Sequence, residues 1–176
     1  VVKIRRFRQV RVVAAALSNQ SGESTMTIPL KDGWKPLVML AHLGGAKVPD
    51  TQQIAIKVKQ LDEFCRDEDV GPVDFIKCDT EGFEYFVFSG AKNLLSHHYP
   101  TIFCEIEEPY LKRQGVNPSD LFNLFFDLGY ASYLPTHSDK LTPVSGYQQR
   151  GDYLFIHPSR FPAGLSNTEQ IETHKL

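Results

Sequence analysis

The stretch VDFIKCDTEGFEYF, residues 73–86, joins a short apolar run to charges at alternate positions. Lys77, Asp79 and Glu81 stand two residues apart, and Gly82 follows before a second apolar run. Side chains two apart on an extended chain project to the same side, about 7 Å from one another. Gly82 has no Cβ and permits a tight turn. The stretch therefore predicts a strand that ends in a charged edge and leads into a helix.

The elements after this stretch alternate between strand and helix. Apolar residues recur at helical spacing over 83–98, with Gly90 as a candidate kink, and Asn117 and Gly129 delimit a second helix. Strands are predicted at 72–79, 101–108, 131–135 and 151–158. This order is typical of a mostly parallel α/β sheet with helices on both faces. The last two strands have no helix between them, so we expect an antiparallel pair at one edge.

The first part of the chain predicts further strands. Apolar or alternating patterns predict strands at 10–18, 24–30 and 54–61, a helical turn within 37–43 and a short helix at 61–67. Basic residues interleaved with apolar ones predict an amphipathic helix over 1–11. Residues 163–176 resemble a flexible tail.

Composition excludes several classes of protein. The 176 residues are 41% hydrophobic, enough for one domain with a core. Lys and Arg total 19 against 21 for Asp and Glu, so the basic excess of a nucleic-acid binder is missing. No apolar stretch reaches the roughly 18 residues that span a bilayer. We therefore expect a soluble protein without nucleic-acid or membrane partners.

Three cysteines, Cys65, Cys78 and Cys104, are widely spaced and form no C-x-x-C pair. This pattern favours buried free thiols in a reducing compartment, so the expected location is cytoplasmic. The chain opens at Val1 with what resembles the middle of a helix. We expect it to be a piece of a longer protein.

The charges at the end of the strand indicate a binding edge. Ligands of open parallel sheets bind beyond the carboxyl ends of the strands. Lys77, Asp79 and Glu81 lie there, and Glu105 and Glu107 follow the next strand. The alternative is structural. Acidic residues stabilise the start of a helix by about 0.3–1 kcal/mol each, and Asp79 or Thr80 could be an N-cap. That alternative does not explain Lys77 at the end of an apolar strand, where a charge needs a partner or solvent.

A metal site is a weaker hypothesis. Asp79 and Glu105 on neighbouring strand ends could hold Mg²⁺ or Ca²⁺, although two carboxylates are a weak signal. His97 and His98 end a predicted helix, where the helix dipole stabilises a positive charge. Neither has a second ligand four residues away, so a role at the helix end is favoured over metal binding.

Residues 76–84, IKCDTEGFE, are followed by SGAKNLL, by Pro100 and by the strand TIFCEIEE. In this order they resemble the core of the FkbM family of S-adenosylmethionine-dependent methyltransferases. The similarity continues upstream through residues 12–22 and 58–64 and downstream to residues 151–158, and so covers nearly the whole chain.

The resemblance implies a class I methyltransferase fold, which is Rossmann-like and has a seven-stranded sheet in the order 3-2-1-4-5-7-6. It implies S-adenosylmethionine as cofactor and a hydroxyl on a sugar, polyketide or similar small molecule as acceptor. Asp79, Glu81 and Lys77 are then the candidate catalytic residues, with Asp79 or Glu81 as the base. Glu105 and Glu107 are candidates for substrate binding. A divalent metal at Asp79 is the alternative role for that residue.

The chain departs from the family pattern in one respect. The D-x-G-x-N-x-G cofactor loop of the first family strand, and the acidic end of the second, are not in residues 1–176. Strand 72–79 is therefore expected to be an exposed parallel edge, and strand 10–18 to have no neighbour. We expect this truncated domain alone neither to bind S-adenosylmethionine appreciably nor to fold stably.

Two other functions compete with methyl transfer. A metal-dependent hydrolase could use a similar α/β sheet, and its activity would need a metal and no S-adenosylmethionine. A non-catalytic interaction module could be the remnant of a methyltransferase. Trp34, His42 and the 134–151 loop are weak candidates for lining an acceptor site.

Overall fold

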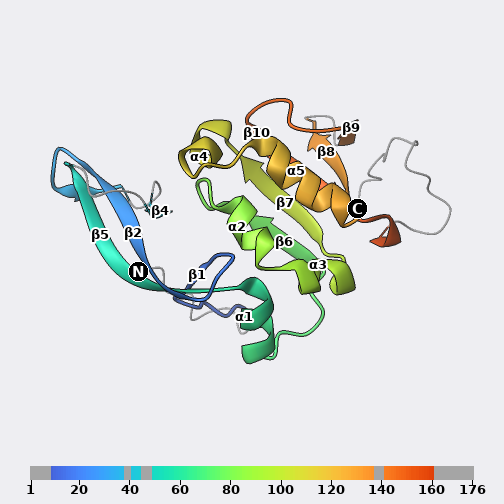
Figure 1. The fold of residues 1–176 in the computed structure, drawn as a ribbon, viewed down its shortest axis with the longest axis horizontal. Helices are drawn as coiled ribbons and strands as arrows, with labels where there is room; N and C mark the ends of the chain where they lie inside the picture. The colour runs from blue at the N-terminus through green and yellow to red at the C-terminus, as the bar shows by residue number, and fades with distance from the viewer. Residues whose placement is uncertain (1–8, 38–40, 45–48, 137–140, 161–176) are drawn as a thin grey trace.

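The structure is a computed structural model that describes residues 9–37, 41–44, 49–136 and 141–160 (Figure 1). The helix predicted over 1–11 lies mostly outside these residues, and residues 9–11 are not helical. The predicted tail at 163–176 lies outside them. Of the helical turn predicted within 37–43, residues 38–40 lie outside, and His42–Leu43 form a strand instead.

The strands of the described residues form two sheets of five strands each. The first sheet contains β1 (Ala16–Leu17), β2 (Gly22–Lys31), β3 (Lys35–Pro36), β4 (His42–Leu43) and β5 (Thr51–Lys59). The second has the order β6-β7-β10-β8-β9. Its strands are β6 (Phe75–Cys78), β7 (Thr101–Ile106), β8 (Ala131–Pro135), β9 (Leu141–Val144) and β10 (Gly151–Ile156).

A long antiparallel pair of strands, β2 and β5, dominates the first sheet and extends away from the helices (Figure 1). The strands predicted at 24–30 and 54–61 are confirmed as parts of it. The strand predicted at 10–18 shrinks to β1, and Val12 before it is 68% exposed. The prediction that this segment has no neighbour is wrong, because β1 pairs in parallel with β5.

The second sheet corrects the prediction of a mostly parallel sheet. Within it only β6 and β7 pair in parallel, while β10 runs antiparallel to both β7 and β8, and β9 antiparallel to β8. The predicted antiparallel pair therefore exists, but β10 lies inside the sheet and β9, within a loop predicted to be irregular, forms the edge. The order β6-β7-β10-β8 is the one that the family resemblance implies for strands 4-5-7-6. β6 is the other edge, as expected.

Five α-helices and one 3₁₀ helix occur in the described residues. The helix predicted at 83–98 is divided into α2 (Glu84–Ser89) and α3 (Lys92–His98). The break falls at Gly90, where an added Cβ would lie 2.4 Å from the Ser18 carbonyl oxygen. The predicted α1 (Leu61–Asp67) and α5 (Pro118–Asp127) are confirmed, whereas α4 (Glu108–Arg113) was not predicted. The 3₁₀ helix is η2 (Pro158–Arg160).

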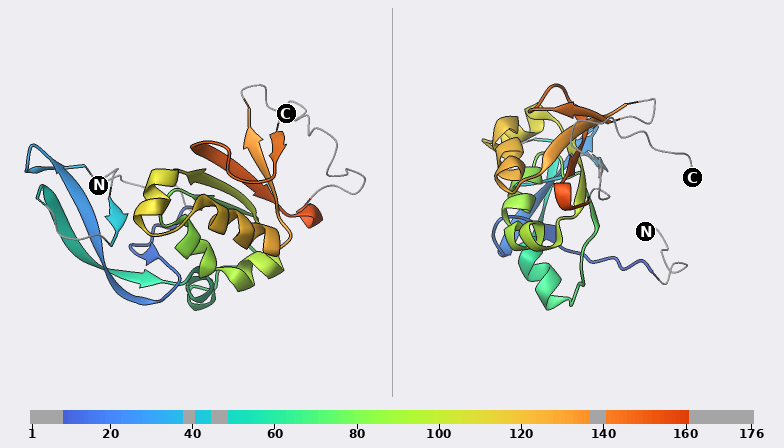
Figure 2. Two further views of the ribbon diagram at one scale, coloured as in Figure 1. Left: turned by 45° about the horizontal axis from the view of Figure 1, so that its top comes forward. Right: turned by 90° about the vertical axis from the view of Figure 1, so that its right-hand side faces the viewer.

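The helices α2, α3 and α5 lie on one side of the second sheet (Figure 2). The expected helices on both faces are thus not found within the described part of the chain. The core fills the space between sheet and helices. Its centre is a set of fully buried side chains from β7, β10 and the helices: Ile102, Cys104, Ile106, Tyr153, Phe155, Phe88, Leu121 and Phe125.

Alternation along β7 sets the direction of the charged side chains. Ile102, Cys104 and Ile106 are fully buried against the helices, so Phe103 and Glu105 point to the other face. Lys77 is opposite Phe103 and shares that face. All three cysteines are buried free thiols, as predicted.

Candidate functional site

The predicted site residues meet where β6 and β7 end. These two strands are parallel and in register, with Cys78 opposite Cys104. Their next residues, Asp79 and Glu105, therefore emerge side by side, and burial together with the negative charge of Asp79 raises the pKa of Glu105.

The turn after β6 has an unusual backbone. Glu81 has φ 56° and Gly82 has φ 106°, both in the left-handed region. A Cβ on Gly82 would lie 2.5 Å from the Tyr110 carbonyl oxygen, so the turn contacts α4 directly through its backbone. The role predicted for Gly82 is confirmed. A left-handed residue other than glycine is strained by about 1–3 kcal/mol and persists only where its surroundings hold it.

Glu84 holds this turn. Its Oε1 accepts hydrogen bonds from the Thr80 backbone N–H at 2.8 Å, the Thr80 hydroxyl at 2.9 Å and the Gly82 backbone N–H at 3.2 Å. The residue is 2% exposed. The N-cap alternative for Asp79 is therefore wrong, because α2 begins at Glu84 and its N-cap residue is Phe83. The carboxylate that accepts the hydrogen bonds of the turn is Glu84, the first residue of the helix.

A small pocket unites the acidic side chains. We call it the acidic pocket; it is lined by Asp79, Glu81, Gly82, Glu84, Glu105, Glu107 and Tyr110. All four predicted acidic site residues line it, and Glu84 is a fifth carboxylate that sequence reasoning did not single out. The signal for it in the sequence was the E-x-x-E spacing of Glu81 and Glu84 after the strand.

Lys77 does not line the acidic pocket. Its Nζ lies 3.0 Å from Asp79 Oδ2, and their side chains are 57% and 38% exposed. The Asp79 hydrogen bond raises the pKa of Lys77, so the lysine remains a cation beside the pocket. An exposed pair of this kind contributes little to stability.

Two of the carboxyl groups hold their protons more tightly than free glutamate does. Burial raises the pKa of Glu81, and the negative charges of Asp79 and Glu107 raise it further, opposed by His42. Burial likewise raises the pKa of Glu105, followed by the charges of Asp79 and Asp152. A carboxylate with a raised pKa is a stronger base than a free one.

An apolar pocket lies on the other side of the same turn. Its volume is about 300 Å³, and it is lined by Ala15, Ala16, Leu17, Met26, Ala41, His42, Leu43, Thr80 and Phe83. Thr80 and Phe83 flank Glu81, so the two pockets share the turn. Sequence reasoning proposed only His42 from this set. The small residues of 14–16 were the signal that space is left here.

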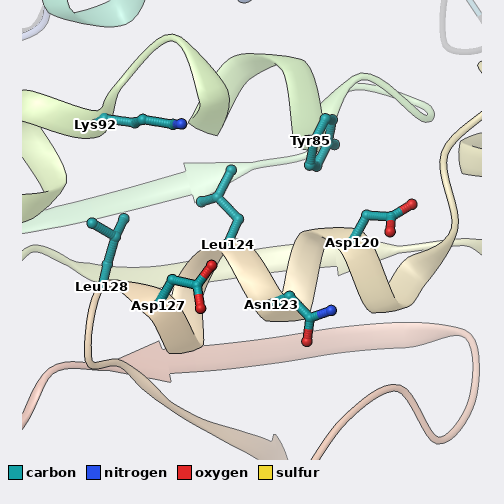
Figure 3. Close-up of a pocket in the computed structure, with 7 residues that line it drawn as sticks. All are labelled: Tyr85, Lys92, Asp120, Asn123, Leu124, Asp127 and Leu128. Carbon is teal, nitrogen blue, oxygen red and sulfur yellow. The ribbon is translucent and has the colours of Figure 1, made fainter.

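Two larger pockets lack converging chemical groups. One, of about 340 Å³, lies between α5 and the pair α2–α3 (Figure 3). The carboxylates of Asp120 and Asp127 stand about two helical turns apart in it. The other, of about 480 Å³, includes His97 and His98. These histidines occupy the last turn of α3, as predicted, and His98 accepts a hydrogen bond from Val73 N–H.

The metal hypothesis gains no ligand from the structure. Asp79 and Glu105 do lie together, but no group of three or more His, Cys, Asp or Glu side chains in the described ranges could hold a metal ion. Trp34 is 74% exposed in the turn between β2 and β3 and does not line either pocket of the site. No helix in the part of the chain that is described has the length and hydropathy needed to cross a membrane.

The fold and the site therefore define an α/β domain with an acidic edge next to an apolar pocket. The model of the Methyltransferase FkbM domain family matches residues 3–132. This match covers well over half of the chain, and the chain belongs to the FkbM methyltransferase family. The match ends within β8, short of residues 151–158, to which the sequence resemblance extended. No curated protein and no solved structure matches the chain.

Proposed function

We propose that this protein is an S-adenosylmethionine-dependent methyltransferase that methylates a hydroxyl oxygen of a small acceptor such as a sugar or polyketide. Membership of the FkbM family supports methyl transfer. The observation that carries the proposal is the convergence of five carboxylates, from the turn after β6 and the end of β7, next to an apolar pocket. The whole of residues 1–176 is proposed to belong to this one domain.

Glu81 is the proposed general base. It lines the acidic pocket, its backbone is held in a strained conformation, and Thr80 and Phe83 of the same turn line the apolar pocket. Burial raises its pKa, which strengthens it as a base once it is ionised. A group in this role accelerates a reaction by about 10²–10⁴-fold.

Asp79 and Lys77 are proposed to orient the site. The Lys77 ammonium holds the Asp79 carboxylate at 3.0 Å, and Asp79 in turn raises the pKa of Glu105 by its charge, after burial. The position of Glu105 and Glu107 across the pocket from Glu81 suits them to bind the acceptor.

The residues present could form part of a site for the methyl donor, although the D-x-G-x-N-x-G loop of the family is not among them. S-adenosylmethionine carries a positive sulfur, which carboxylates attract, and an adenosyl group with an apolar ring. Leu17, Leu43 and Phe83 would hold that ring in the apolar pocket. When bound, the donor supplies a methyl group to the acceptor oxygen and leaves as a neutral thioether. The chain's own part is to align the acceptor, exclude water and accept the hydroxyl proton at Glu81.

The test is a transfer assay on the natural full-length protein with radiolabelled S-adenosylmethionine and a panel of sugar, amino sugar and polyketide alcohols. We expect a methyl ether product, identified by mass spectrometry, that forms equally well in the presence of EDTA. Asp79→Asn is expected to lower turnover at least tenfold with near-normal donor binding. Hydrolysis that needs a metal and no S-adenosylmethionine would refute the proposal in favour of a hydrolase, and a protein inert toward the whole panel would favour an interaction module.

A further inference from the structure

The acidic pocket carries more negative charge than its neighbours compensate. Five carboxylates line it: Asp79, Glu81, Glu84, Glu105 and Glu107. Among the described residues, two side-chain cations form ion pairs with them, and His42 lies near enough to Glu81 to oppose the rise in its pKa. Lys77 pairs with Asp79 at 3.0 Å, and the 78% exposed Arg150 reaches Glu107 only at 3.5 Å. The interior of the pocket is therefore strongly attractive to a positive group.

Glu84 provides an independent observation. Its Oε1 accepts three hydrogen bonds from the turn, but Oε2 is buried and has no hydrogen-bond partner among the described residues. Buried carboxylate oxygens are almost always hydrogen-bonded, and an unpaired one is costly. Because Glu84 lines the acidic pocket, a donor group placed there meets this side chain, and it reaches Oε2 once the carboxylate turns to expose that oxygen.

The size of the pocket limits what this group can be. Its volume is about 10 Å³, which is room for one group the size of a water molecule. An ammonium head has this size and offers three N–H donors, whereas a guanidinium or a quaternary ammonium is too large. A divalent metal ion needs several oxygen ligands at 2.0–2.6 Å, and the described residues contain no such group of three.

We propose that the acidic pocket binds a protonated primary amine of the methyl acceptor, so that the acceptor is an amino alcohol, such as an amino sugar, rather than a neutral alcohol. This inference rests on the proposed function, because only a methyltransferase has a methyl acceptor. Binding of the amine itself does not require methyl transfer. The ammonium donates to Glu84 Oε2 and to the carboxylates around it, and it brings a hydroxyl of the same molecule beside Glu81.

The experiment measures binding of two matched probes to the full-length protein by amide NMR. Ethanolamine and ethylene glycol have nearly the same size and share a hydroxyl, but only ethanolamine carries an ammonium at neutral pH. The backbone amides of Thr80 and Gly82 report directly on Glu84, because both donate to it. We expect ethanolamine to shift these amides saturably, and ethylene glycol and tetramethylammonium to leave them unchanged.

Glu84→Gln is the test variant, because the glutamine amide oxygen can still accept the three hydrogen bonds of the turn while its NH₂ replaces Oε2. We expect its ethanolamine affinity to fall at least tenfold with the turn intact. The matched control is Glu23→Gln, on exposed β2, which should bind like the natural protein.

Three results would overturn the inference. Ethanolamine could give no more shift than sodium chloride at equal ionic strength, or Glu84→Gln could bind it unchanged. In the third, S-adenosylmethionine but not S-adenosylhomocysteine displaces ethanolamine, which would assign the positive charge in the pocket to the donor sulfonium. Failure of the proposed function is distinct: ethanolamine then binds as described, but no acceptor is methylated.

Discussion

The turn that presents Glu81 depends on Gly82, and replacing this glycine by alanine tests how tightly the turn is held. Two separate costs apply to Gly82→Ala. The backbone φ of 106° is in the left-handed region, which costs an L-residue about 1–2 kcal/mol. The new Cβ would also lie 2.5 Å from the Tyr110 carbonyl oxygen and 2.6 Å from its carbon, and overpacking of this kind costs about 1–3 kcal/mol. The expected loss of unfolding free energy is about 2–5 kcal/mol.

Gly115 separates the two costs. It has φ 76°, but an added Cβ would meet no atom within 4 Å. Gly115→Ala should therefore lose only the backbone part, about 1–2 kcal/mol. Gly71, with open space and no left-handed φ, should be nearly neutral. Urea unfolding of the full-length protein, followed by far-ultraviolet circular dichroism, gives all three values. Equal losses for Gly82→Ala and Gly115→Ala would refute the contact between the turn and α4.

Three further predictions concern the core, the contacts of Arg160 and pH. Phe125→Ala, which removes a fully buried ring stacked 4.1 Å from Phe155, should lower the unfolding free energy by about 3–5 kcal/mol; a loss below 1 kcal/mol in urea unfolding would contradict the packing described. Arg160→Ala removes hydrogen bonds to Asp74 and to backbone carbonyls and should raise amide exchange at the start of β6 relative to β8; unchanged exchange would show that the arginine does not hold this end. Because burial raises the pKa of Glu81 above its unfolded value, the folded state binds the proton more tightly, and stability should fall as pH rises from about 4.5 through the raised pKa. Glu81→Gln should flatten this fall, and the same pH slope in both proteins would contradict the raised pKa.

The second half of the chain could be predicted well because its signals are local. The N-cap Asn117 and the C-terminal Gly129 predict α5, and the alternation in 101–108 predicts β7. The charged edge also follows from local pattern, since period two along β6 and β7 places Asp79 and Glu105 at adjacent strand ends.

The features that could not be predicted depend on contacts between distant residues. The division of the helix at Gly90 results from the approach of the Ser18 carbonyl, which no local pattern reveals. The position of β10 inside the sheet depends on its pairing with β7, 45 or more residues earlier. The apolar pocket is assembled from β1, β2, β4 and the turn after β6, so its residues carry no common motif.

The role of Glu84 shows the same limit within the site. Its spacing from Glu81 was visible, and it fits a favourable acidic helix start. Only the fold shows that the side chain is buried and turns back to Thr80 and Gly82. A local pattern thus identified the acidic residues, while burial distinguishes Glu84, which both holds the turn and lines the acidic pocket, from the more exposed ones.

The measurement that tests the central claim most directly compares methyl transfer by Glu81→Gln with that of the natural full-length protein. Donor affinity is measured in parallel by calorimetry, so that a lost base can be told from a lost binding site. The account predicts that kcat falls by about 10²-fold or more while the Kd for S-adenosylmethionine changes less than threefold. A kcat within a factor of two of the natural protein would mean that the acidic pocket does not take the proton, and the proposed mechanism would be wrong.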